Sequence, residues 1–111
     1  MAESVANITV SLPGEVQPIL DSLAGITLNQ KIAHLLLGEV RRNLETSEQE
    51  RLELEVKYGM EYETFQQQLE SGALGNVFDY DLEIDALRWS DLIAEKRHWL
   101  EQVRALRDID L

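Results

Sequence analysis

The chain has 111 residues, no cysteine and a formal net charge of −11. The lack of cysteine excludes disulfide frameworks and thiolate metal sites, and the strong acidity argues against a non-specific nucleic-acid binder, which needs a basic surface. Because no apolar run approaches the length of about 18 residues that a membrane span needs, we expect no membrane contact. The first residues have no signal-peptide pattern. We therefore expect a cytoplasmic protein.

The charge is distributed unevenly along the chain. Residues 1–44 carry a net charge of −1, and residues 45–57 a net charge of −3. Residues 58–85 contain seven acidic residues and no basic one, whereas the charges of residues 86–111 balance to zero. This asymmetry indicates two surfaces that meet different partners.

The first expected element is a strand over residues 7–12, NITVSL, where polar and apolar residues alternate. Ile8, Val10 and Leu12 fall on one face of this strand, and a Pro-Gly pair ends it. A single strand leaves its backbone N–H and C=O groups unpaired, and the chain offers no second convincing strand. We therefore expect the strand to pair with its equivalent in a second copy, which makes the protein a homodimer.

Two helices are expected after this strand. The first begins near Gly14 and ends at Gly25, and its only proline lies in the first turn, where a missing N–H is tolerated. The second begins after Thr27, which forms a capping box with Gln30, and it reaches Leu44. The helices should pack beneath the paired strands and bury their apolar face. The predicted dimer interface consists of Ile8, Val10, Leu12, Ile32, Leu35 and Leu36.

Three further helices are expected in the rest of the chain. One begins at Thr46 or Ser47 and ends near Gly59, because Ser47 and Glu50 form a second capping pattern. A short one follows over residues 61–70. The last begins near residue 79 and ends near residue 108.

The order strand, helix, helix, read as ITVSLP, EVQPILDSLAG and ITLNQKIAHLLL, resembles the ribbon-helix-helix family of DNA-binding proteins. The resemblance covers residues 7–44. It implies that a dimeric ribbon enters the major groove of operator DNA and reads bases with its outward side chains. It also implies a phosphate contact at the start of the second helix. The implied DNA-binding residues are Asn7, Thr9, Ser11, Thr27, Asn29 and Lys31.

The strand departs from the family in one respect, because it carries no arginine or lysine. Phosphate neutralisation supplies much of the affinity for DNA, so binding should be weak. A dimerisation module that does not bind DNA is the alternative. The expected fold class is mostly α, with a ribbon-helix-helix-like dimerisation and DNA-binding head over residues 1–44. A helical, acidic, partner-binding extension follows over residues 45–111.

The acidic segment 58–85 also contains five aromatic residues. Aromatic anchors surrounded by carboxylates are typical of a surface that binds a basic protein. A solvated acidic face over a small aromatic core is the alternative, and for the two tryptophans the alternative is ordinary packing along the last helix. The candidate partner-binding residues are Tyr62, Phe65, Phe78, Tyr80, Trp89 and Trp99.

A ribbon-helix-helix head with an acidic tail resembles the type II antitoxins, and KYGMEYETFQQQLESG resembles a segment of small prokaryotic antitoxin-like proteins. This resemblance implies that the tail neutralises a basic toxin while the head represses its own operon. The alternative function is a dimeric scaffold or adaptor that binds a basic protein and no DNA. A purely structural helical oligomer is a third option.

We expect neither catalysis nor a cofactor. The alternating acidic residues between 79 and 85 suggest a calcium loop, but such a loop needs Gly at its sixth position and Glu at its twelfth. Those positions are Ile84 and Ser90. An acid-rich helix start explains these residues better. The two histidines have no neighbouring ligand pattern, so we expect no metal site.

Overall fold

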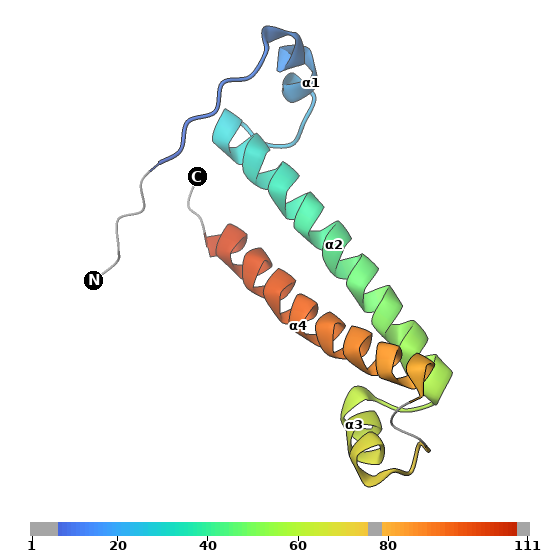
Figure 1. Cartoon of the computed structure of the whole chain (residues 1–111). Coiled ribbons are helices and arrows are strands. Elements are labelled where there is room, and N and C mark those ends of the chain that lie inside the picture. Colours follow the sequence, from blue (N-terminus) through green and yellow to red (C-terminus); the bar gives the residue numbers. More distant parts are fainter. Residues whose placement is uncertain (1–6, 76–78, 109–111) are drawn as a thin grey trace, which may run out of the picture.

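The structure is a computed structural model that describes residues 7–75 and 79–108. Two long antiparallel helices, α2 and α4, lie side by side, and the short helix α3 packs at the end where they are joined (Figure 1). We call this end the closed end, and the opposite end, where α2 begins and α4 finishes, the open end. The molecule is elongated, with extents of 59 × 38 × 19 Å. The helices are η1 (Gly14–Val16), α1 (Gln17–Asp21), α2 (Leu28–Tyr58), α3 (Tyr62–Ser71) and α4 (Tyr80–Asp108).

The expected strand does not form. Residues 7–12 run as an irregular segment ahead of α1, and none of the described residues belongs to a strand (Figure 1). A strand exists only as part of a hydrogen-bonded ladder, and the described part of the chain offers this segment no ladder partner. The prediction of a ribbon-helix-helix-like fold is therefore wrong. The alternating residues instead belong to an irregular segment, and the apolar ones, Ile8, Val10 and Leu12, line a groove described below.

The expected break after Leu44 is also absent, because α2 continues as one helix of 31 residues. Its start is as predicted: the Thr27 side chain accepts a hydrogen bond from the Gln30 N–H, and Gln30 completes the capping box. Its end lies at Gly59, which has a left-handed backbone with φ of 67°. The helix therefore crosses the expected boundary between residues 44 and 45 without interruption.

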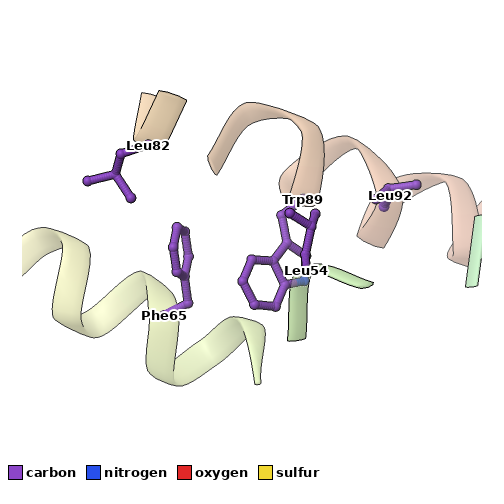
Figure 2. Close-up of a cluster of buried hydrophobic side chains, with 5 residues drawn as sticks. All are labelled: Leu54, Phe65, Leu82, Trp89 and Leu92. Carbon is purple, nitrogen blue, oxygen red and sulfur yellow. The ribbon is translucent and has the colours of Figure 1, made fainter. Parts of the chain in front are cut away.

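The hydrophobic core lies at the closed end, between α2, α3 and α4 (Figure 2). Trp89 and Phe65 are fully buried, and their ring centroids are 4.7 Å apart. The rings of Tyr58 and Tyr62 pack against Trp89 at centroid distances of 6.0 and 5.6 Å. This aromatic cluster holds the short helix α3 against the two long ones. The buried members of the core are Leu54, Phe65, Leu82, Trp89 and Leu92.

Polar contacts between α2 and α4 add to this core and fix how the helices align. The Arg88 guanidinium donates hydrogen bonds to Glu50 on α2 and, at 2.9 Å, to Glu95 on its own helix. The hydroxyl of buried Ser47 donates to Glu95 Oε2 at 2.8 Å. Sliding one helix along the other would break these bonds together, so the network specifies a single register.

We expect acid to destabilise this helical hairpin. Hydrogen bonds from Arg88 lower the pKa of Glu50, and those from Arg51 lower the pKa of Glu48. A carboxyl whose pKa is lower in the folded state stabilises the fold above its unfolded pKa, about 4.5. That contribution is lost as the pH falls through the folded pKa.

The check is the midpoint of thermal unfolding, followed by circular dichroism from about pH 7 to pH 3. The midpoint temperature should stay nearly constant from pH 7 to about pH 5 and should decrease at lower pH. The variant Glu50→Gln should show a smaller fall, because it lacks one of the titrating groups. A midpoint that rises steadily to pH 3 would contradict the prediction, since relief of repulsion among the acidic residues would then outweigh the lost pairs.

Candidate protein-binding surfaces

The first candidate surface is an apolar groove of about 390 Å³ at the open end. One wall is the irregular segment 7–12, in which Ile8 is 88% and Val10 67% exposed. The other wall is the first three turns of α2, and α4 contributes one leucine. We call this site the open-end groove. Its lining residues are Ile8, Val10, Leu12, Leu28, Asn29, Ile32, Ala33, Leu36 and Leu106.

The turn between α1 and α2 sets the position of the two walls. Gly25 has φ of 117°, and a Cβ at this position would lie 2.9 Å from the backbone nitrogen of Lys31. Only glycine combines this backbone conformation with such a close approach. The Lys31 ammonium donates a hydrogen bond to the Leu23 carbonyl at 2.8 Å, which ties the end of the α1 region to α2. The groove is therefore built on a tightly packed turn.

Of the six predicted dimer-interface residues, the structure brings together five in the open-end groove, namely Ile8, Val10, Leu12, Ile32 and Leu36. Leu35 is not among the residues that line it and is 46% exposed. Leu28 also lines the groove and was not predicted to do so, although it lies one turn before Ile32 on the same side of α2. Leu106 could not be placed without knowing how α4 packs.

The predicted DNA-binding residues do not form one reading surface. Asn7, Thr9 and Ser11 are exposed, but the paired ribbon that would align them is absent from the described chain. The hydroxyl of Thr27 and the ammonium of Lys31 are used in the bonds described above. Asn29 lines the open-end groove. The described geometry therefore adds no support for base recognition.

The second candidate surface is acidic and lies at the closed end. Residues 58–85 supply seven carboxylates and no basic residue, and among these carboxylates only Asp85 forms an ion pair with a described residue, Lys57 at the end of α2. Burial raises the pKa of Asp85, but hydrogen bonds from Lys57 and Tyr58 outweigh it, so the pKa lies below its usual value. The other six carboxylates are exposed. We call these six the closed-end acidic surface: Glu61, Glu63, Glu70, Asp79, Asp81 and Glu83.

The predicted partner-binding aromatics divide into core and surface residues. Phe65 and Trp89 are fully buried, so a partner cannot reach them while the core is intact. Tyr62 is half-buried against the same core. Tyr80 is 72% exposed, and Trp99 is half-buried beside the ring of its neighbour His98. Phe78 lies outside the described residues.

Within residues 7–75 and 79–108, no group of three histidine or acidic side chains is placed to hold a metal ion. None of the helices described is long and apolar enough to cross a membrane.

Comparison of the chain with protein-family models, with curated proteins and with solved structures found no match.

Proposed function

We propose that the chain is an adaptor that binds a basic protein at its closed end. The observation that carries this proposal is the closed-end acidic surface, where six exposed carboxylates have no ion-pair partner among the described residues. Two of them, Glu63 and Glu70, lie two turns apart on one side of α3. A dense set of uncompensated charges steers and complements a surface of opposite sign.

The aromatic core supports the same proposal, because it fixes α3, the helix that carries two of these six carboxylates. Phe65 anchors α3 between Tyr58 and Trp89, with ring centroids 4.8 and 4.7 Å away. A charged surface on a fixed helix loses little conformational freedom when a partner binds. The antitoxin role stays a prediction, in which the basic partner would be a toxin.

The experiment that tests the adaptor proposal is affinity capture from a lysate of the host cells. The full chain should retain a basic protein at low salt, identified by mass spectrometry, and release it as the salt concentration rises. The double variant Glu63→Lys/Glu70→Lys should weaken this interaction by roughly tenfold or more. Titration of the purified partner by calorimetry gives the affinities.

The matched control is Glu45→Lys/Glu53→Lys, which makes the same change in net charge at exposed positions of α2. It should bind the partner nearly as well as the unmodified chain. If both double variants weaken binding equally, only the net charge matters and the closed end is not the site. If no basic protein is retained at low salt, the proposal is wrong.

A further inference from the structure

We propose that the open-end groove binds a second copy of this chain, giving a two-fold dimer whose closed ends point away from each other. This inference concerns a different surface from the proposed adaptor site and does not depend on it. It rests on three properties of the groove: its exposed apolar lining, its two-sided shape, and the charge around it.

The apolar lining is concentrated at one end of the molecule. Ile8, Val10, Leu12, Leu28 and Leu36 are all exposed by 42% or more, although they lie next to one another along the same groove. A soluble monomer rarely exposes so many large apolar side chains in one patch, and such patches mark association sites. Covering them removes apolar surface from water, which is the main driving force of protein association.

The shape of the groove suits a symmetric contact. In a two-fold dimer the same patch meets itself, so it must contain both a projecting part and a recess that receives it. The segment 7–12 supplies the projecting part, with Ile8 almost fully exposed at its start. The stripe of Leu28, Ile32 and Leu36 lines the opposite side of the recess. Each copy can therefore place its segment against the helix stripe of the other.

The nearly balanced charge around the groove favours a second copy of the chain as its occupant and does not attract a basic protein. Residues 7–44 contain three acidic and three basic residues, and residues 96–108 contain two acidic and four basic ones. A basic protein would be drawn instead to the closed end, where residues 58–85 carry seven acidic residues and no base. The formal charges therefore sum to zero over residues 7–44 and to +2 over residues 96–108, so two copies meet at their open ends with far less like-charge repulsion than at their closed ends.

The length of the molecule keeps the repelling ends apart in such a dimer. The long axis measures 59 Å, and the closed end lies at the far end of it from the groove (Figure 1). Electrostatic interactions are screened over about 8 Å at physiological ionic strength. Joining two copies at their open ends thus hides apolar surface and adds almost no repulsion between the acidic ends.

Sedimentation velocity of the full chain tests this inference. The unmodified protein should sediment as a dimer of 12.7 kDa subunits at micromolar concentrations. Leu36→Glu should weaken the dimer by at least about tenfold, because each copy would bury a carboxylate in the apolar groove. Val56→Glu is the matched control: this residue also lies on α2, is 83% exposed and does not line the groove, so the dimer should persist.

A second variant protects the test against misfolding. Ile8→Asp changes a residue of the irregular segment that is 88% exposed, so it should leave the helical content unchanged and still weaken the dimer. Raising the salt concentration should keep or strengthen the dimer, whereas it should release a basic partner from the closed end. Glu63→Lys/Glu70→Lys should also leave the dimer intact, which separates failure of this inference from failure of the adaptor proposal.

Three outcomes would overturn the inference. One is an unmodified chain that stays monomeric up to about 100 µM, where even a weak dimer of micromolar affinity would be populated. Another is a dimer that persists in both Leu36→Glu and Ile8→Asp. The last is dissociation caused equally by Val56→Glu, because that residue lies in the last turn of α2 and the contact would then lie at the closed end, away from the groove.

Discussion

Replacing Trp89 with alanine is expected to lower the free energy of unfolding by about 3–5 kcal/mol, the usual range for a buried large aromatic. Trp89 is fully buried, and its ring contacts three other aromatic rings from α2 and α3. Removing it leaves a cavity at the one place where all three helices meet. Since domains are typically stable by about 5–15 kcal/mol, this single change should remove a large part of the stability of the fold.

Urea denaturation followed by circular dichroism measures this loss. The control is Tyr80→Ala, on the same helix but 72% exposed, which should change the stability by less than about 0.5 kcal/mol. Trp89→Phe should cost much less than Trp89→Ala. It keeps an aromatic ring in the core and removes an indole N–H that has no hydrogen-bond acceptor among the described residues. Equal stability of Trp89→Ala and Tyr80→Ala would show that this cluster is not the core.

Replacing Phe65 with alanine is expected to cost a similar amount, about 3–5 kcal/mol, but with a local consequence. Phe65 is the fully buried residue of α3 and packs between Tyr58 and Trp89. Without this ring, α3 keeps only half-buried contacts such as Tyr62 and Leu69. A helix of ten residues does not persist in water without tertiary packing, so α3 should unfold before α2 and α4 separate.

Amide hydrogen exchange distinguishes this local opening from global unfolding. In Phe65→Ala the amides of α3 should exchange much faster than those in the middle of α2 and α4. Gln67→Ala, an exposed position of the same helix, is the control and should leave all three helices protected. Uniform loss of protection across the three helices would contradict the prediction. The same variant should weaken binding of a basic partner, because α3 carries Glu63 and Glu70.

The sequence predicted the start of α2 well, because the Thr27–Gln30 capping box involves only neighbouring residues. The sequence also predicted that this helix ends at Leu44, which is wrong. That prediction took Thr46 or Ser47 as the cap of a new helix. Serine and threonine cap helices, but inside a helix their hydroxyls find other acceptors. Thr46 donates to the Arg42 carbonyl one turn back at 3.0 Å, and Ser47 donates to Glu95 on α4. The second of these partners cannot be known before α4 is placed.

The strand expected over residues 7–12 was also wrong, but the alternation of polar and apolar residues did predict which side chains lie together. Ile8, Val10 and Leu12 line one groove together, while Thr9 and Ser11 do not. Period-two alternation shows which side chains share a side, but it cannot show that a ladder partner exists.

The candidate sites show the same division between local and tertiary information. The acidic surface could be predicted from composition, because charge depends on residue type and exposed carboxylates are the rule. The aromatics could not be assigned to core or surface, since one ring can fill either role. Leu82, Trp89 and Leu92 do recur on one side of α4 at helical spacing. Only the placement of α2 and α3 opposite that side shows that Trp89 is buried.

The unbroken α2 also affects how the protein is made. This helix emerges from the ribosome before α4, and its side chains are mostly polar, so it lacks the packing that stabilises a long helix in water. Its stable contacts, such as those of Leu54 with the closed-end core, need residues as late as Leu92. The hairpin therefore closes only after most of the chain has been synthesised. Until then Leu54, which the closed-end core buries in the folded chain, is exposed to other molecules around the nascent chain.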